Sequence, residues 1–259
     1  KKNKINNKVG QFFNIQHKSS YNSLQDWINR FNLIGGQCFI NSNTFLYCYN
    51  RKSISKMTDK RCLYLINTGN YEGEKININN NNNEYNCDVI LFTDNIQQIK
   101  YCFEQNIIPF YTFSNTFQDP QKLQRFIKTS PHLWLPYEYD ISIYIDGNVM
   151  LTIQDTEILV KNFLSNHDVV CWKHPNRSNI FDEADQVVKK NLAKPNSVIK
   201  VLELMRQDGF KDDVGLTETN ILIRRHKNII PFSNKWSDFV NICRRDQISF
   251  DYLLYKFNI

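Results

Sequence analysis

The length and composition of this chain are those of a folded α/β protein. It has 259 residues, 41 % of them apolar, which is enough for one sizeable core with a small appendage. No run of 18 apolar residues occurs, which argues against a membrane-spanning helix. The net charge of +6 is spread along the chain without a run of five or more Lys or Arg. The charge pattern therefore favours anionic ligands weakly and gives no basic stripe for binding nucleic acid.

The seven cysteines are an odd number, and no Cys-x-x-Cys motif occurs. Cys87, Cys102 and Cys171 lie in or beside apolar runs, as small buried hydrophobic residues do in a reducing compartment. We therefore expect a cytoplasmic protein, or a lumenal one if a targeting segment has been removed. The chain begins Lys-Lys without a Met, so we expect it to be part of a longer multidomain protein.

Residues 1–60 differ in character from the rest of the chain. Ser23 is placed to cap a short helix that ends at Gly35-Gly36, and residues 38–49 are aromatic and typical of strands. We interpret residues 1–60 as a small N-terminal appendage or the tail of a preceding module. The main domain is predicted to span residues 61–259.

The main domain alternates apolar strands with helices. Strands are predicted at 62–66, 87–92, 107–113, 141–145, 168–172 and 221–223. Helices are predicted at 96–106, 120–130, 152–164, 180–192, 197–209, 236–243 and 248–255. This alternation predicts an α/β fold with a mostly parallel sheet flanked by helices. Pro109 cannot donate a backbone hydrogen bond, which predicts an edge position for its strand.

The central feature is the stretch Tyr139–Thr152, in which an isoleucine-rich strand ends abruptly at Asp146-Gly147-Asn148. Ligands of open α/β sheets bind beyond the carboxyl ends of the strands. We therefore expect Asp146 and Asn148 to face a crevice at the sheet edge, and Gly147 permits the tight bend between them. Because both side chains carry oxygen atoms, we predict that this turn lies beside a bound phosphate or metal.

Polar corners follow three other strands: 93–95, 173–177 and 224–226. If all the strands are parallel, the four corners share one edge and one crevice. A nucleoside diphosphate leaving group would need a divalent cation or basic side chains there. Asp146 and Asn148 would offer oxygens to Mg²⁺ or Mn²⁺. The basic residues expected to neutralise a diphosphate are Arg125, Lys128, Lys173, His174 and Arg177.

Five segments carry a family resemblance, in the same order. They read YNCDVILFTDN, RFIKTSPHLWLPYEYDISIYIDGN, WKHPNRSNIFDEAD, LTETNILIRRHKN and RRDQISF. Over residues 86–251 the chain resembles the TOD-like hexosyltransferases and, more broadly, the GT-A glycosyltransferases. The resemblance implies a GT-A-like, Rossmann-like domain that transfers a hexose from a nucleotide sugar, with a UDP-sugar favoured, to a glycan or protein acceptor.

The resemblance also implies roles for individual residues. Asp94 would lie near the nucleoside, and Asp146 near the diphosphate and any Mn²⁺ or Mg²⁺. Glu218 and Asp246 are the candidate catalytic acids, one of which would bind acceptor or sugar hydroxyls and take the acceptor proton. The flanking donor-binding residues would be Arg125, Lys128, Asn148, His174 and Arg177, with His226 as a further metal ligand. Many GT-A enzymes carry Asp-x-Asp where this chain has Asp-Gly-Asn, so dependence on a metal is left open.

Other functions remain as alternatives. The Asp-Gly-Asn corner is compatible with a catalytically weak or inactive module that binds a nucleotide sugar or glycan within a larger protein. A haloacid-dehalogenase-type hydrolase is disfavoured because Tyr144 stands where its nucleophilic Asp would be needed. A nucleic-acid-binding module would need a basic stripe with interleaved aromatic residues, and the sequence has none.

Overall fold

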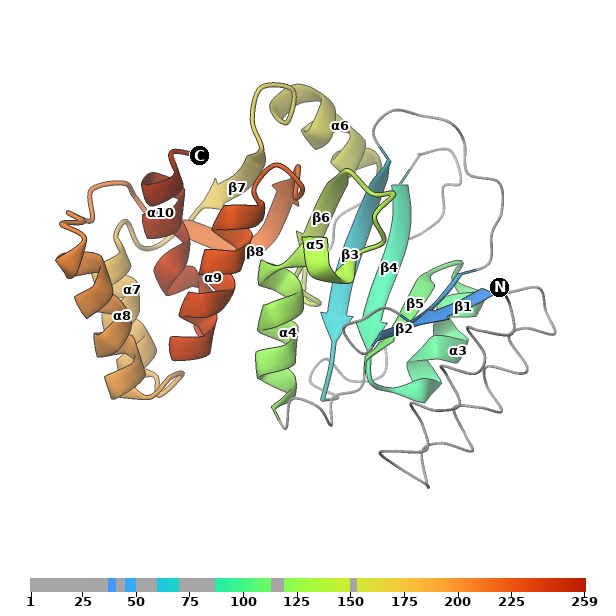
Figure 1. The fold of residues 1–259 in the computed structure, drawn as a ribbon, viewed down its shortest axis with the longest axis horizontal. Coiled ribbons are helices and arrows are strands. Elements are labelled where there is room, and N and C mark those ends of the chain that lie inside the picture. The colour runs from blue at the N-terminus through green and yellow to red at the C-terminus, as the bar shows by residue number, and fades with distance from the viewer. Residues whose placement is uncertain (1–36, 41–44, 50–59, 70–86, 113–118, 150–152) are drawn as a thin grey trace.

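The structure is a computed structural model that describes residues 37–40, 45–49, 60–69, 87–112, 119–149 and 153–259. These residues form one eight-stranded sheet with the order β1-β2-β5-β4-β3-β6-β8-β7 (Figure 1). The strands are β1 (Gln37–Ile40), β2 (Phe45–Tyr49), β3 (Arg61–Asn67), β4 (Cys87–Thr93), β5 (Ile108–Thr112), β6 (Ile141–Ile145), β7 (Val169–Lys173) and β8 (Thr217–Arg224).

The four central strands β5, β4, β3 and β6 pair in parallel, which confirms the predicted mostly parallel sheet. β8 pairs antiparallel with both β6 and β7, so β7 runs in the direction of β6. The carboxyl ends of β4, β6 and β7 therefore lie at one edge of the sheet. The carboxyl end of β8 lies at the opposite edge, because that strand runs the other way.

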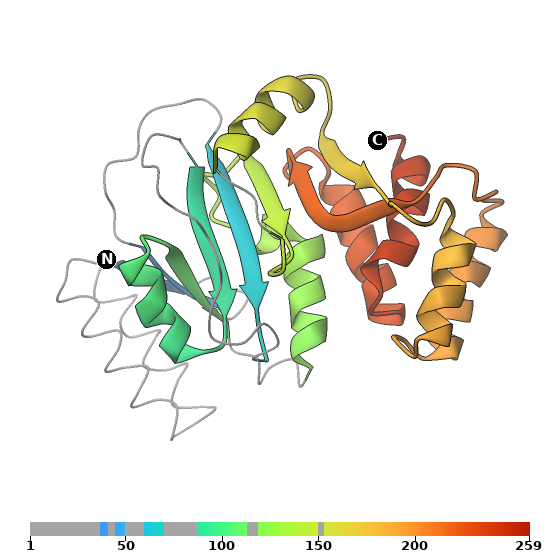
Figure 2. The same ribbon diagram turned by 180° about the vertical axis from the view of Figure 1, so that it is seen from behind.

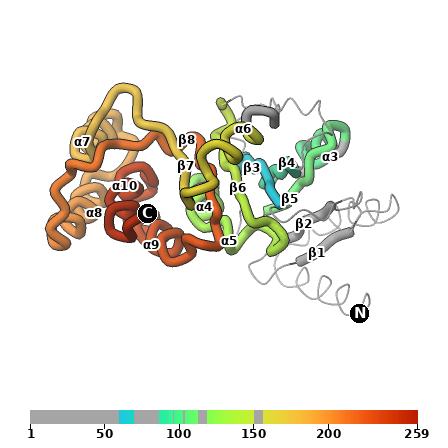
Figure 3. The backbone as a smooth tube through the Cα atoms, turned by 90° about the horizontal axis from the view of Figure 1, so that it is seen from above, coloured from blue at the N-terminus to red at the C-terminus, as the bar shows by residue number. Residues whose placement is uncertain are grey.

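Helices cover both faces of the sheet (Figures 1 and 2). Figure 3 shows α3 and α6 on one side of β3, β4 and β6, with α4 and α5 on the other. The helices are α3 (Ile96–Glu104), α4 (Pro120–Thr129), α5 (Pro131–Trp134), α6 (Ile153–Phe163), α7 (Ile180–Lys189), α8 (Pro195–Gln207), α9 (Ile230–Ile242) and α10 (Asp246–Phe257).

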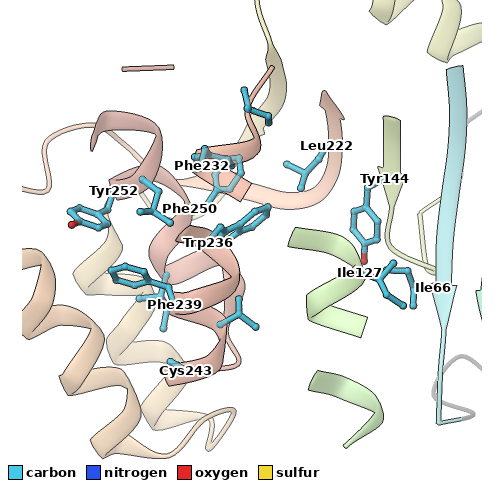
Figure 4. Packing of buried hydrophobic residues seen from close by; sticks show 14 of the residues in the cluster. Ile66, Ile127, Tyr144, Leu222, Phe232, Trp236, Phe239, Cys243, Phe250 and Tyr252 are labelled. Atoms are coloured by element: carbon cyan, nitrogen blue, oxygen red, sulfur yellow. The ribbon is translucent and has the colours of Figure 1, made fainter. Parts of the chain in front are cut away.

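The core has two parts because successive strand residues point to opposite faces. Tyr144 and Leu222 lie on the face covered by α4, α9 and α10, where Trp236 and Phe250 pack between the last two helices (Figure 4). Ile143 belongs to the other core cluster, together with residues of α3 and α6. This arrangement leaves the carboxyl edge of the sheet for polar side chains.

Helix α4 begins and ends where its sequence predicts. Asp119 caps its first turn by accepting the backbone N–H groups of Gln121 and Lys122, and Pro120 takes the first position. The helix ends at Thr129, and Pro131 opens the short helix α5. Because β3 and β4 end beside its first turn, α4 starts at the carboxyl edge of the sheet (Figure 1).

The prediction that Pro109 marks an edge strand is wrong. β5 pairs with β4 on one side and with β2 on the other. The ladder with β2 covers Phe110, Tyr111 and Thr112 and stops short of Pro109. The missing N–H of Pro109 therefore falls just outside that ladder, where the sheet does not need it.

The described residues cover only part of the N-terminal region, residues 1–60. β1 and β2 extend the sheet beyond β5, whereas the helix predicted after Ser23 lies outside the described residues. The boundary near residue 60 stays a prediction.

Among the described cysteines, Cys62, Cys87, Cys102, Cys171 and Cys243 are free thiols. None of the helices described has the length and apolar character needed to cross a membrane.

Candidate functional site

A cavity of about 530 Å³ opens at the carboxyl edge of the sheet, and we call it the edge cavity. Its lining residues come from the end of β6, the first turns of α4, the start of α10 and the turn between α7 and α8. This is the position at which ligands bind in open α/β sheets. Its lining residues are Gln121, Gln124, Arg125, Asp146, Asn148, Asn191, Leu192, Arg244 and Arg245.

A buried group of charges lies beside the edge cavity and joins α4 to α10. Lys128 Nζ is 2.6 Å from Asp246 Oδ2, and Arg125 Nη1 is 3.2 Å from Asp246 Oδ1. Arg125 and Lys128 face the same way because they are three residues apart on one helix. Lys128 and Asp246 are almost fully buried, whereas Arg125 reaches the lining of the cavity.

Two strands complete this group, which we call the charged network. Thr219 on β8 donates its hydroxyl to Asp246 Oδ2 at 3.1 Å and accepts from Lys128 Nζ at 3.1 Å. Tyr144 on β6 donates its hydroxyl to Asp146 Oδ1, and Lys128 Nζ lies 3.9 Å from that same oxygen. The network therefore connects Asp246, inside the fold, to Asp146 at the cavity wall.

The charged network keeps Asp246 ionised. Burial acts to raise the pKa of this carboxyl, but the charges of Arg125 and Lys128 outweigh it and hold the pKa well below the usual range. Burial lowers the pKa of the Lys128 ammonium, and Asp246 and Asp146 act in the opposite direction. A general base works best with a pKa near the operating pH. Asp246 is therefore better suited to holding Arg125 and Lys128 in place than to accepting a proton.

Arg224 turns out to be a structural residue. It is fully buried, and its Nη1 donates to the backbone carbonyl of Lys128 at 2.9 Å. Its Nη2 donates to the hydroxyl of Tyr64, which in turn lies 3.4 Å from the Lys128 carbonyl. The guanidinium thus satisfies the Lys128 carbonyl near the end of α4, directly and through Tyr64, and holds the helix that carries Lys128 in place.

Asp94 follows β4 at the same edge of the sheet as Asp146, with β3 between the two strands. Both of its carboxylate oxygens accept the backbone N–H of Gly69, at 3.1 and 2.9 Å. Gly69 has a φ of +70° and lies against Pro120, the first residue of α4. Asp94 therefore braces the turn after β3 beside the edge cavity, although it is not among the lining residues.

His174 and Arg177 form a separate cluster after β7. The imidazole Nδ1 accepts the backbone N–H of Asn176 at 3.1 Å and of Arg177 at 3.0 Å. Arg177 Nε lies 2.6 Å from Glu183 Oε2 on α7. Burial, followed by the charge of Arg177, lowers the pKa of His174, while the carboxylates of Glu183 and Glu218 oppose this change. Glu218 pairs with Trp172 across the β7–β8 ladder, so its backbone lies close to the end of β7 that leads to His174.

The structure does not bring His226 together with Asp146. His226 follows the carboxyl end of β8, and the pairing of Ser142 with Arg224 places that end beside the start of β6. Asp146 follows the other end of β6. Burial, together with the charges of Arg224 and Lys227, lowers the pKa of His226 to about 3, so the ring is neutral. Three of the four predicted corners lie at the carboxyl edge, because β8 is antiparallel, and of these the corner of Asp146 and Asn148 lines the edge cavity.

Several residues of the edge cavity were missed by the sequence reasoning. Arg244 and Arg245 immediately precede α10, and the only available signal was a pair of arginines before an apolar helix. Gln121 and Gln124 share with Arg125 the exposed side of α4. The lining therefore holds three guanidinium groups, four side-chain amides and one carboxylate.

This set of side chains does not fit a divalent cation well. Mg²⁺ and Mn²⁺ prefer carboxylate oxygens, and Asp146 is the one carboxylate in the cavity lining. One of its oxygens already accepts from Tyr144 and lies close to the Lys128 ammonium. Asn148 is neutral. Within the described part of the chain, no group of three or more His, Cys, Asp or Glu residues is arranged to hold a metal.

Comparison with protein families identifies the domain that holds the edge cavity. Residues 111–259, more than half of the chain, match the family model described as TOD1/MUCI70, glycosyltransferase-like domain. The chain belongs to this family. The matched TOD1/MUCI70 region includes every residue that lines the edge cavity and the whole charged network. A search of curated proteins found no match.

One solved glycosyltransferase shares the fold, and a second was also matched. The apo structure of WbbM, a bifunctional glycosyltransferase, aligns with a TM-score of 0.51 and 12 % identity over 78 % of this chain. The match covers 38 % of the WbbM chain. The apo form of mouse xyloside xylosyltransferase 1 aligns with a TM-score of 0.43 and 9 % identity, over 76 % of this chain and 82 % of that one. The likeness to WbbM agrees with a GT-A-like fold for the TOD1/MUCI70 domain.

Proposed function

We propose that this chain transfers a hexose from a nucleoside diphosphate sugar, with UDP-sugars favoured, to a glycan or protein acceptor. The observation that carries the proposal is the edge cavity. It lies at the carboxyl edge of the sheet in a TOD1/MUCI70 glycosyltransferase-like domain, and Arg125, Arg244 and Arg245 line it. Guanidinium groups bind phosphate oxygens with two parallel hydrogen bonds, which suits a diphosphate.

The arrangement of the edge favours one orientation of the donor. The diphosphate would lie against the three arginines, and the nucleoside would extend over the ends of β3 and β4 towards Asp94. The carboxylate of Asp94 holds the turn at Gly69. In this orientation, Asp94 would shape the part of the site that receives the nucleoside. The sugar would extend towards Asn148 and the end of β7.

The reaction needs a base for the acceptor and a charged environment for the leaving group. The bond from the anomeric carbon to the diphosphate oxygen breaks, and a bond from that carbon to the acceptor oxygen forms. We assign the acceptor proton to Glu218, because the charged network already commits Asp246 to Arg125 and Lys128. Glu218 lies at the same edge, two residues before Asn220, whose carbonyl accepts the backbone N–H of Asp146 at 2.8 Å.

The charge that grows on the departing diphosphate is the main demand on the protein. Fixed cationic groups around a developing negative charge are usually the largest single contribution to such catalysis. Arg125 is held by Asp246, so its guanidinium is oriented before the donor binds. Asp246 is therefore a positioning residue in this proposal.

The test is hydrolysis and transfer with a panel of UDP- and GDP-hexoses, because many glycosyltransferases slowly hydrolyse their donor without acceptor. We expect nucleoside diphosphate to be released from at least one donor. Asp146 is the carboxylate of the cavity lining, and we assign it to accept a hydrogen bond from a hydroxyl of the donor sugar. Asp146→Ala is therefore expected to lower the rate of release by about a hundredfold or more, while the melting temperature stays near that of the unmodified chain.

Three other results would change the assignment. Full donor turnover by the Asp146→Ala variant would remove Asp146 from the mechanism. Binding of a nucleotide sugar without hydrolysis or transfer to any acceptor would favour the alternative of a binding module. Absence of both binding and turnover across the panel would overturn the proposed function.

A further inference from the structure

We propose that arginine side chains, in place of a divalent cation, neutralise the donor diphosphate in the edge cavity. This inference rests on the proposed function and specifies how the same site recognises its ligand. It concerns Arg125, Arg244 and Arg245, which approach the cavity from α4 and from the segment before α10.

The balance of charge in the cavity lining favours an anion. Three guanidinium groups face one carboxylate, that of Asp146. The guanidinium of Arg244 lies 3.9 Å from Asp119 Oδ2, a loose pair in which both side chains are about half exposed to solvent. Such pairs are weak, so Arg244 can turn to a phosphate at little cost.

Arg245 offers an unsatisfied donor. Its Nε is buried and has no hydrogen-bond partner among the described residues, although the residue lines the cavity. A buried N–H without an acceptor is unfavourable, and a phosphate oxygen in the cavity would satisfy it. An anion at this position would therefore accept a hydrogen bond from a donor of Arg245 that the free protein leaves unsatisfied.

The start of α10 strengthens the preference for an anion. Arg245 occupies the N-cap position, and its side chain makes no capping hydrogen bond to the first turn of this helix. The N-terminus of a helix carries partial positive charge and exposed backbone N–H groups, both of which favour phosphate. By contrast, Asp119 already caps the first turn of α4.

The carboxylate that a cation would need is already occupied. Asp146 Oδ1 accepts the hydroxyl of Tyr144, and the ammonium of Lys128 lies 3.9 Å from the same oxygen. Lys128 is fixed there by Asp246 at 2.6 Å. A divalent cation on Asp146 would be repelled by this buried ammonium, and the neutral Asn148 adds no charge to hold it.

The experiment measures the affinity of the full chain for UDP by calorimetry, once in EDTA and once with excess Mn²⁺. We expect the two dissociation constants to agree within about twofold, because charge neutralisation comes from the protein. GDP replaces UDP if the panel of donors shows that the chain uses guanosine. Dissociation constants that fall by tenfold or so on adding Mn²⁺ would overturn the inference while leaving the proposed function intact.

A second experiment uses arginine variants. Arg244→Ala and Arg245→Ala are each expected to weaken UDP binding in EDTA by about tenfold, since each removes a charged hydrogen bond to phosphate. Binding of uridine, which lacks the diphosphate, should hardly change. Arg206→Ala is the matched control, because Arg206 lies on α8 against the ring of Phe181 and outside the cavity lining.

The outcomes distinguish a failure of arginine-based recognition from a failure of the proposed function. Unchanged UDP affinity in both arginine variants would overturn the inference even if binding is independent of Mn²⁺. If neither UDP nor GDP binds with or without Mn²⁺, the proposed function fails and the inference fails with it. The melting temperature of each variant shows whether a loss of binding comes from unfolding.

Discussion

Gly69 is a residue on which the shape of the site depends. Its φ of +70° lies in the left-handed region, and a Cβ added there would come within 2.5 Å of Pro120 Cβ. Its N–H is the group that Asp94 binds. The turn after β3 therefore packs against the start of α4 only if residue 69 has no side chain.

Gly69→Ala is expected to destabilise the fold by about 2–4 kcal/mol, from left-handed backbone strain and from the clash with Pro120. Gly209→Ala is the matched control, because Gly209 has a φ of +75° with nothing within 4 Å of the added Cβ. Its cost should be about 1–2 kcal/mol, from backbone strain alone. Urea unfolding of the two variants measures the difference, and equal losses would show that the contact with Pro120 is unimportant.

At the scale of single residues, the sequence predicted which residues lie in the site better than it predicted what each residue does there. Asp146 and Asn148 were placed in the crevice because an apolar strand that ends at Asp-Gly-Asn has a clear physical reading, and both line the edge cavity. The role of Asp246 depends on Lys128 and Thr219, which are far from it in sequence. Pairings of this kind follow from packing and have no local signature.

At the scale of elements, the charged network fastens α10 to α4. Asp246 begins α10, Lys128 lies near the end of α4, and both are buried. Trp236 on α9 donates its indole N–H to the backbone carbonyl of Asp246 at 2.9 Å, which brings the third helix of this layer to the same point. A buried ion pair affects stability mainly through the large cost of removing one partner, because the remaining charge would then be buried without compensation.

Asp246→Asn is expected to destabilise the chain by about 3–5 kcal/mol, because it removes the close counter-charge of the buried Lys128 ammonium and leaves it only Asp146 Oδ1, 3.9 Å away. A second substitution, Lys128→Met in the same chain, should restore most of the loss, since it removes the uncompensated charge. Urea unfolding at pH 7 of the single and double variants tests this. A double variant no more stable than Asp246→Asn would argue against the ion pair as the cause.

The effect of Asp246→Asn should depend on pH in a defined direction. The pKa of Asp246 is lower in the folded chain than its unfolded value of about 3.9, so the ionised group stabilises the fold above that pH. This stabilisation is lost as the pH falls below about 4 towards the folded pKa. The difference in unfolding free energy between the unmodified chain and the variant should therefore be full at pH 7 and shrink below pH 4.

The sequence predicted the elements well and one strand direction poorly. α4 was predictable because Asp119, Pro120 and Pro131 are strong local signals for its start and its end. β8 was not, since an apolar run has the same pattern in either direction. That strand was also predicted as 221–223, although it spans Thr217–Arg224, because its polar first half lacks an apolar pattern.

At the scale of the whole molecule, the reversed direction of β8 decides which polar groups share an edge. It carries Arg224 and His226 away from the carboxyl edge, and it brings Thr219 and Glu218 towards it. A sheet of uniformly parallel strands would have put His226 beside Asp146. Instead, arginines from α4 and from the segment before α10 line the edge cavity, which supports our proposal that it binds an anionic donor.

A second cavity offers the clearest competing location for a ligand. It has a volume of about 420 Å³ and lies beside β7 and the start of β8. Its charged lining residues are Lys173 and Asp213, one of each sign, so it lacks the positive balance of the edge cavity. The account therefore places the diphosphate in the edge cavity and leaves this second cavity outside the donor site.

The most direct test of the central claim is a crystal structure of the chain with bound UDP, or GDP if that is the preferred base. The account predicts the diphosphate in the edge cavity, with phosphate oxygens within hydrogen-bonding distance of Arg125, Arg244 and Arg245. Density for the nucleotide in the cavity beside β7, or near His226 at the opposite edge, would contradict it.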